Sequence, residues 1–148
     1  MSQPPSDLHT CHFHEIIVGM SASRDYAITA GVYEHFLAAF QDYSPLHLDE
    51  EFARARGFSG KVMHGSLLNG FVSNFVGMYF PGKFSLLLSV DLRYANPSYL
   101  GDVITIDAVV SQKMDVQKVV VLDITLTNNT RHSLAARGRV QVMVKEAA

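Results

Sequence analysis

The chain is poor in cysteine, in tryptophan and in long hydrophobic runs. Its 148 residues include one cysteine, Cys11, and no tryptophan. No disulfide can therefore form within the chain, and a reducing compartment suits it. No apolar run approaches the roughly 18 residues that a membrane-spanning helix needs. Residues 1–10 lack the basic-then-apolar order of a signal peptide, so we expect a cytoplasmic protein without a membrane partner.

An excess of positive charge is also missing. The 12 Lys and Arg residues face 14 Asp and Glu residues, which gives a formal net charge of −2. A nucleic-acid-binding protein needs basic residues to neutralise phosphates, so nucleic acid is not expected as a partner. Composition and length fit one globular domain over residues 1–148, and residues 1–10 are expected to form a loose N-terminal arm.

The first third of the chain predicts short elements. Residues 12–18 are expected to form a short strand, and residues 24–29 a second extended segment. Thr29 is a suitable N-cap for a helix over residues 30–40, whose apolar residues recur at helical spacing.

Pro45 separates this helix from the next one. Because proline cannot continue a helix, residues 42–47 are expected to form a loop whose shape Pro45 partly fixes. Asp49 then caps a second short helix that runs to about residue 56, and Gly57 is a natural stop.

The longest helical pattern runs from residue 65 to about residue 80 and is apolar around most of its circumference. Such a helix is expected to be buried on most sides. Small and polar residues nevertheless form one stripe along it at helical spacing: Ser66, Asn69, Gly70, Ser73 and Gly77. The stripe either lines a site or lets another segment pack closely.

The rest of the chain predicts four long strands with alternating apolar residues. They cover residues 84–95, 102–113, 118–127 and 132–145. Short turns between them indicate an antiparallel meander. A nearly all-apolar helix followed by long strands is accommodated when the sheet curls around the helix, so we expect an α+β fold with a central buried helix.

Asp42 and His47 are the strongest candidates for chemistry. They lie five residues apart with Pro45 between them, which limits how far the two side chains can drift apart. A carboxylate and an imidazole can share a water molecule, as general acid–base catalysis requires. The alternative is a surface aspartate that closes a helix and a histidine that packs in a loop.

Gly65 follows His64 at the start of the long helix. Amide N–H groups at a helix start lack internal partners, and glycine lets another group approach the backbone. Together they can form an oxyanion hole for a carbonyl oxygen that gains negative charge. An ordinary glycine-containing helix start is the alternative, and His64 itself is expected to be structural.

Polar residues of the stripe could line such a site beside the Asp–His segment: Ser66, Asn69 and Ser73. Ser73 is the best candidate, since its hydroxyl could orient Asp42. An acid–base pair with an oxyanion hole suits the addition of water to a double bond conjugated to a carbonyl, or its removal. A thioester carbonyl is a good activator, because its enolate is reachable once the oxygen is stabilised.

The segment Asp-Tyr-Ser-Pro-Leu-His at residues 42–47 resembles the signature of the (R)-specific enoyl-CoA hydratases, in the MaoC-like branch of the hot-dog superfamily. The pattern of that family is Asp-x-Asn-Pro-aliphatic-His. Residues 63–68 resemble the family's His-Gly-x-Leu start of the central helix, and the similarity runs from about residue 16 to the C-terminus. Two positions depart from the pattern: Ser44 replaces Asn, and Gln41 stands where many members carry Gly.

The resemblance implies a hot-dog fold and a homodimer. It also implies that Asp42 and His47 are catalytic, that the amide of Gly65 binds the thioester oxygen, and that Ser73 lines the active site. The substrate would be a trans-2-enoyl thioester of coenzyme A or of an acyl carrier protein. Syn hydration would give the (R)-3-hydroxyacyl product, and dehydration is the reverse. Asn69 could select a polar or branched acyl chain.

No cofactor is expected beyond the carrier of the acyl group. His9, His12 and His14 suggest a metal site, and His12 and His14 would share one face of a strand, but no carboxylate or cysteine is expected to complete a ligand set with them, so no metal is expected. Two other functions remain open. An acyl-thioesterase is disfavoured because the helix at residues 65–80 carries no Asp or Glu. A non-catalytic acyl-thioester-binding subunit would suit the departures from the family pattern.

Overall fold

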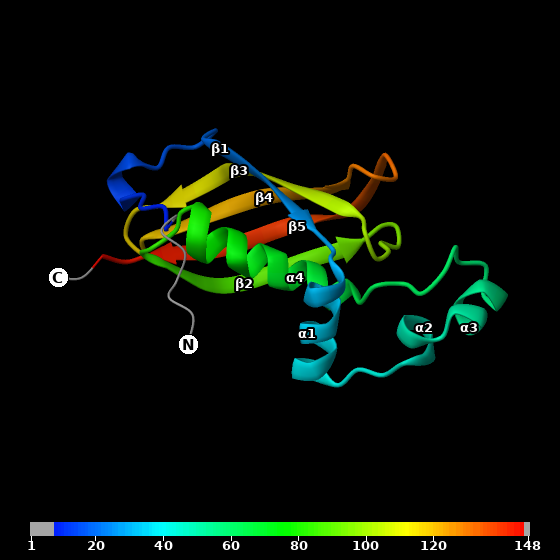
Figure 1. Ribbon diagram of the computed structural model, residues 1–148. Helices are drawn as coiled ribbons and strands as arrows, with labels where there is room; N and C mark the ends of the chain where they lie inside the picture. The colour runs from blue at the N-terminus through cyan, green and yellow to red at the C-terminus, as the bar shows by residue number, and fades with distance from the viewer. Residues whose placement is uncertain (1–7, 147–148) are drawn as a thin grey trace.

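A five-stranded antiparallel sheet and one long helix form the body of the molecule (Figure 1). The computed structural model describes residues 8–146. The sheet has the order β1-β3-β4-β5-β2, and all neighbouring strands are antiparallel. The strands are β1 (Ser21–Ala27), β2 (Ser85–Tyr94), β3 (Val103–Met114), β4 (Val119–Asn128) and β5 (Ser133–Val144).

The position of β2 differs from the predicted meander. β3, β4 and β5 follow one another as expected. However, β2 lies at one edge of the sheet and pairs with β5, and β1 lies at the other edge and pairs with β3. The connection from β2 to β3 therefore joins two strands that are not neighbours. An alternating sequence identifies a strand but not its partner, and the prediction of a four-strand meander was wrong at this point.

The long helix, α4 (Gly65–Asn74), continues into a π-helical segment, η2 (Phe75–Tyr79), and lies against one face of the sheet (Figure 1). Its buried face packs on inward-pointing strand residues, and each large apolar side chain buried there contributes about 1.5–3 kcal/mol. The buried residues of the two helical segments are Leu67, Leu68, Phe71, Val72, Phe75 and Val76. This confirms the predicted α+β architecture with a central helix.

The opposite side of α4 is open. Ser66, Gly70, Ser73 and Gly77 of the predicted stripe are exposed, so the helix is buried on fewer sides than its composition suggested. Small side chains on an open helix face allow another segment to approach closely.

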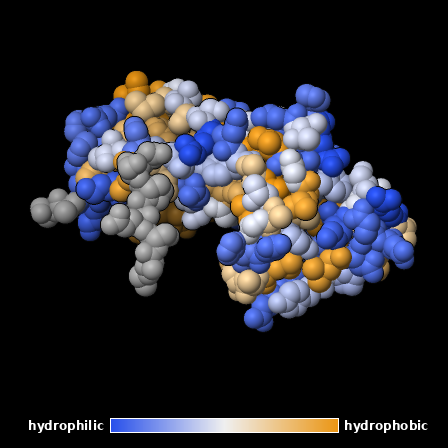
Figure 2. All heavy atoms as spheres, in the orientation of Figure 1, coloured by the Kyte–Doolittle hydropathy of each residue, from blue (hydrophilic) through white to orange (hydrophobic). Residues whose placement is uncertain are grey.

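Three short helices project beyond the sheet (Figure 1). They are α1 (Ala30–Phe40), α2 (Pro45–Leu48) and α3 (Glu50–Ala55). Figure 2 shows hydrophobic residues gathered on the surface of this projection, among them Phe40, Leu48 and Phe52. Exposed apolar groups of this kind mark surfaces that contact another molecule.

Local capping explains where these helices begin. The Val32 N–H donates to Thr29 Oγ1 over 3.1 Å, which confirms the predicted cap of α1. Asp49 caps α3 as predicted. The loop predicted at residues 42–47 was wrong in its second half, because α2 begins at Pro45. Proline is favoured in the first turn of a helix, where no N–H is needed.

The N-terminal segment also differs from the prediction. Residues 12–18 do not form a strand, because Phe13–Glu15 is a single 3₁₀ turn, η1. The Glu15 carboxylate accepts a 2.7 Å hydrogen bond from the His12 N–H, and this local bond favours the turn.

A loose arm was predicted for residues 1–10, and residues 1–7 of it lie outside the described residues. From residue 8 the chain is held in place. The His9 N–H donates to the carbonyl of Met78, and the His9 carbonyl accepts from the Lys83 N–H. Over residues 8–146, no helix combines the length and the apolar character needed to cross a bilayer.

Candidate active site

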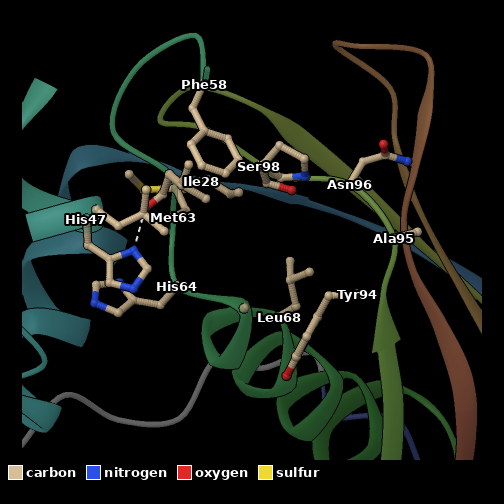
Figure 3. A pocket seen from close by; sticks show the side chains of 14 residues that line it. Ile28, His47, Phe58, Met63, His64, Leu68, Tyr94, Ala95, Asn96 and Ser98 are labelled. Carbon is tan, nitrogen blue, oxygen red and sulfur yellow. Dashed lines mark hydrogen bonds between the residues drawn. The ribbon is translucent and has the colours of Figure 1, made fainter. Parts of the chain in front are cut away.

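A cavity of about 320 Å³ lies between α2, the start of α4 and the end of β2. His47, His64 and Gly65 line it, and Leu68 and Tyr94 face it from α4 and β2 (Figure 3). The other lining residues are mostly apolar, as in small-molecule sites: Ile28, Leu46, Phe58, Val62, Met63, Ala95, Asn96, Pro97 and Ser98. The predicted imidazole and the predicted glycine amide thus belong to one cavity.

His47 is fixed at both its ring and its main chain. Its Nδ1 lies 2.7 Å from the carbonyl oxygen of Val62. A carbonyl can only accept, so Nδ1 carries the proton and the neutral ring has its lone pair at Nε2. The hydroxyl of Tyr33 donates to the carbonyl of His47 over 2.8 Å. Burial raises the pKa of Tyr33, which keeps that hydroxyl a donor.

Asp42 brings its carboxylate to the free side of this imidazole. Asp42 Oδ2 lies 3.9 Å from His47 Nε2, and the Asp42 side chain is 53% exposed. The Ser44 N–H donates to Asp42 Oδ1 over 3.2 Å. A separation of 3.9 Å is too long for a direct hydrogen bond. A water molecule could bridge the gap by donating one hydrogen to each acceptor.

The turn that delivers Asp42 depends on Gln41. Gln41 ends α1 with φ 55° and ψ 29°, and its N–H donates to the carbonyl of Leu37. This left-handed conformation favours glycine, which gives a physical reason why the related pattern carries Gly at that position. A side chain other than glycine costs about 1–2 kcal/mol there.

His64, expected to be structural, contacts both members of the pair. Its Nε2 lies 2.9 Å from the carbonyl oxygen of Asp42 and 3.8 Å from Asp42 Oδ2. Its ring lies against the ring of His47, with 3.7 Å between the centroids and an angle of 31° between the ring planes (Figure 3). This contact could not be predicted from sequence spacing, because His64 lies 17 residues after His47.

The ligand atoms of Asp42, His47 and His64 lie within 4.8 Å of one another, close enough to surround a metal ion. A metal-bound histidine normally donates its other N–H to an acceptor. His47 meets this condition, since Nδ1 donates to Val62. In His64 the nitrogen that faces the Asp42 carboxylate is Nε2, which donates to a carbonyl and so has no lone pair for a metal, and Nδ1 has no partner among the described residues. The donor set therefore fits a proton-transfer pair better than a metal.

Gly65 is the first residue of α4, so no carbonyl of the helix can accept from its amide N–H. A Cβ atom at this position would lie 3.1 Å from the ring of Tyr94, so that ring packs directly on the glycine. The Tyr94 hydroxyl donates to Asn69 Oδ1 over 2.7 Å. Burial raises the pKa of Tyr94, and the hydrogen bond with Asn69 acts weakly against it. Asn69 thus reaches the cavity wall through Tyr94.

Of the predicted substrate-binding residues, Gly65 lines the cavity, whereas Ser66, Asn69 and Ser73 do not, and Asp42 lies beside His47 without lining it. Ser66 and Ser73 are exposed on the open side of α4 and do not line the cavity. Within one chain, the structure does not bring Ser73 to Asp42.

The residues that hold the site together come from distant parts of the sequence. The Val62 N–H donates to the carbonyl of Leu46 over 3.1 Å, and the Met63 N–H donates to the carbonyl of Ser98 over 2.8 Å. The segment before α4 is therefore fixed between α2 and the connection that follows β2. These are main-chain bonds, so the residue types carry no signal from which the sequence could predict them.

Comparison with known proteins gives a consistent result. The family model described as "MaoC like domain" matches residues 17–131. An (R)-specific enoyl-CoA hydratase of Aeromonas caviae is 34% identical over 94 residues, which cover 64% of this chain and 70% of that protein. An (R)-specific enoyl-CoA hydratase of Rhodospirillum rubrum is 28% identical over 138 residues, which cover 93% of this chain and 94% of that protein. The solved structure of an (R)-hydratase from A. caviae involved in PHA biosynthesis has a TM-score of 0.80 at 28% identity, covering 88% of this chain and 98% of that one.

Proposed function

The chain belongs to the MaoC-like domain family, and from this membership we propose that it is an enzyme that adds water to acyl thioesters of coenzyme A or removes it. Its fold is the hot-dog fold, as predicted. More specifically, the proposed reaction is the (R)-specific hydration of trans-2-enoyl thioesters, or the reverse dehydration of 3-hydroxyacyl thioesters.

One observation carries the proposal. The unprotonated Nε2 of His47 lies 3.9 Å from the Asp42 carboxylate, and His47 shares a cavity with the Gly65 amide. The His47 imidazole therefore shares a cavity with a donor suited to a thioester oxygen, and the Asp42 carboxylate lies beside that imidazole. We propose that Asp42 and His47 are catalytic and that Gly65 binds the substrate oxygen.

The steps follow from these positions. The water donates its two hydrogens to Asp42 and His47, which leaves an oxygen lone pair directed at the β carbon. As the C–O bond forms, one of the two side chains takes a proton from the water. The electrons of the double bond move to the thioester oxygen, which the Gly65 amide stabilises. A proton then passes to the α carbon and the carbonyl re-forms. The product contains every atom of substrate and water.

A thioesterase is less well supported. The central helix, α4 with η2, carries no Asp or Glu that could activate water for direct attack on the thioester carbonyl. A non-catalytic binding subunit would retain the cavity but lose turnover.

Crotonyl-CoA separates the three functions. The enoyl absorbance and the free thiol are followed separately. Loss of absorbance without thiol release supports the hydratase, and chiral analysis of the product then tests the (R) configuration. Thiol release would indicate a thioesterase. Binding of crotonyl-CoA without either change would indicate a binding subunit.

We propose that the reaction needs no metal or other cofactor, because the Asp42–His47 pair and the Gly65 amide supply both the proton transfer and the charge stabilisation. Dialysis against a chelator should leave kcat unchanged. A loss of activity that zinc or magnesium restores would contradict this.

Asn69 is proposed to influence which acyl chain binds, because its side chain holds Tyr94 at the cavity wall. The Asn69→Ala variant should change the ratio of kcat/KM between straight and branched enoyl-CoA substrates. An unchanged ratio would refute the role.

The carrier of the acyl group is proposed to meet a small basic region on the projection. Arg54 is paired with Glu50 at 2.9 Å, so Arg56 and Lys61 are the better candidates for the phosphates of coenzyme A or the acidic surface of an acyl carrier protein. Charge reversal at either position should raise KM for the carrier used and leave kcat nearly unchanged.

A homodimer is proposed from the surface of β2. This strand lies at the edge of the sheet, with Leu86 57% and Leu88 45% exposed, and exposed apolar edges favour pairing with another chain. Ser66 and Ser73 could contact substrate only if a second copy closed over the open side of α4. Light scattering should give twice the chain mass, and replacing Leu86 and Leu88 by Glu should give a monomer.

A further inference from the structure

The helix cap does not explain why residue 64 is a histidine. His64 is the N-cap residue of α4, but its side chain makes no capping hydrogen bond, which Ser, Thr, Asp or Asn would make. It is only 2% exposed, and Nδ1 is buried without a hydrogen-bond partner among the described residues. A buried, unpartnered polar atom costs free energy that an apolar side chain would avoid. Such an atom calls for an explanation.

The contacts of His64 supply that explanation. Its Nε2 donates to the carbonyl oxygen of Asp42 over 2.9 Å, and its ring lies 3.7 Å from the ring of His47. One side chain therefore joins the turn after α1, which carries Asp42, to α2, which carries His47. Its own main chain leads directly into Gly65.

The ring has little freedom to move. Phe36 of α1 lies 4.8 Å from it, and Tyr33 of the same helix lies 6.3 Å away, measured between ring centroids. Among residues 8–146, Nε2 meets a hydrogen-bond acceptor and Nδ1 meets none. The carbonyl of Asp42 fixes Nε2 as the donor.

We propose that His64 is a positioning residue, which rests on the function proposed above. Its hydrogen bond holds the main chain of Asp42 and its ring supports His47, so that the carboxylate and the imidazole keep their 3.9 Å separation. The alignment of a catalytic pair acts on the reacting geometry more than on substrate binding. Its loss should therefore lower kcat and leave KM nearly unchanged.

Two substitutions separate the hydrogen bond from the ring. His64→Phe keeps an aromatic ring for the stack and removes the donor to Asp42. His64→Gln removes the ring and keeps an N–H donor at a similar reach. We expect kcat of the Phe variant to fall by about 100-fold with KM within about twofold of the wild type, as for a displaced catalytic group. The Gln variant should recover kcat to within about fivefold of the wild type.

Long-range ¹H–¹⁵N spectra of the histidine rings test the geometry without catalysis. In the wild type they should show the Nε2–H tautomer for His64 and the Nδ1–H tautomer for His47. The His47 signals should stay near their wild-type positions in the Phe variant, which keeps a ring against His47, and should move in the Gln variant, which does not. Assignment uses the loss of the corresponding signals in the His64 and His47 variants.

The outcomes decide between positioning and packing. A Phe variant with wild-type kcat, a Gln variant as slow as the Phe variant, or a change confined to KM would overturn the proposal, as would an Nδ1–H tautomer at His64. Thermal unfolding shows whether each variant is folded. If the Phe variant is not folded, kcat and the His47 signals of the Gln variant decide between positioning and packing. If the wild type does not consume enoyl thioesters, the proposed function fails, and the ring spectra still decide whether His64 holds Asp42.

Discussion

Two aspartates of this chain have opposite surroundings. Asp42 is half exposed, and its carboxylate accepts one hydrogen bond from the protein within residues 8–146, from the N–H of Ser44. Asp102 is 2% exposed, and its carboxylate accepts from the N–H of Tyr99, from Asn128 Nδ2 and from Arg131 Nε over 2.6–3.1 Å.

The difference shows how one side chain can serve chemistry or architecture. A carboxylate has about four sites that accept hydrogen bonds. At Asp102 protein donors occupy most of them, so the group is inert and joins β4 and the turn after it to the connection before β3. At Asp42 most of them stay open toward His47 and solvent. A reactive carboxylate needs open sites, and a structural one needs them filled.

The largest effect should come from Asp42. Asp42→Asn keeps the oxygen that accepts from Ser44 but removes the charge and the second acceptor for water. We expect kcat for crotonyl-CoA hydration to fall by about 10³-fold, within the range for loss of an acid–base group, while the unfolding temperature stays close to that of the wild type. Steady-state kinetics and thermal unfolding measure the two quantities.

Asp91→Asn is the matched control for this variant, because Asp91 is an exposed aspartate of β2 that, among residues 8–146, does not pair with His47 or His64 as Asp42 does. It should leave kcat unchanged. If Asp42→Asn retained most of the activity, the open acceptor sites of Asp42 would not serve catalysis.

The same substitution at Asp102 should act on stability instead. Asp102→Asn leaves Arg131 without its anion and places an amide where donors converge, so we expect a loss of about 3 kcal/mol, as when one partner of a buried ion pair is removed. Asp123→Asn is the control, since Asp123 pairs with Arg139 at 2.9 Å on the surface, where such a pair contributes less than about 1 kcal/mol. Urea unfolding measures both. Equal losses of unfolding free energy in the two variants would mean that the burial of Asp102 adds nothing to the contribution of its ion pair.

The sequence predicts the elements of this fold well and their partners less well. Alternating apolar residues mark β3, β4 and β5, and their neighbours in the sheet follow from short turns. The same alternation marks β2, but nothing in residues 84–95 states that β5 is its neighbour. Pro45 cannot continue the helix before it, which predicts a loop over residues 42–47, but proline is also favoured in the first turn of a new helix, and α2 begins there.

The candidate site is predictable where its residues are close in sequence. Asp42, Pro45 and His47 lie in one segment, and their spacing indicates an acid–base pair. The contacts that orient them come from Tyr33, from the carbonyl of Val62 and from His64. These contacts form only once α1, α2 and α4 are assembled. For the same reason, the sequence could not show that Ser66 and Ser73 face away from the cavity.

A smaller effect is expected from Asn128, which is fully buried between Asp102 and Arg131. Its Nδ2 donates to Asp102 Oδ2, and its Oδ1 accepts from the N–H of Arg131. Asn128→Ala removes one donor to a carboxylate that keeps its others, so the loss should be about 1–3 kcal/mol, below that of Asp102→Asn. Urea unfolding of the two variants and of the double variant tests whether the residues act as one network. Losses that simply add would show that they act independently.

The smallest effect should come from Glu50, a carboxylate whose surroundings are intermediate between those of Asp42 and Asp102. It is exposed, yet its oxygens accept from the Lys61 N–H and from Arg54. The Lys61 N–H and the Arg54 side chain lower the pKa of Glu50 below its ordinary value of 4.5. A lowered pKa in the folded state gives stability that is present above 4.5 and is lost as the pH falls through the folded pKa. The unfolding temperature of Glu50→Gln should therefore lie slightly below that of the wild type at neutral pH, and the gap should close in acid.

Glu51→Gln, the adjacent exposed position, should show no such gap. A gap that persisted in acid would mean that Glu50 acts through its shape rather than its charge.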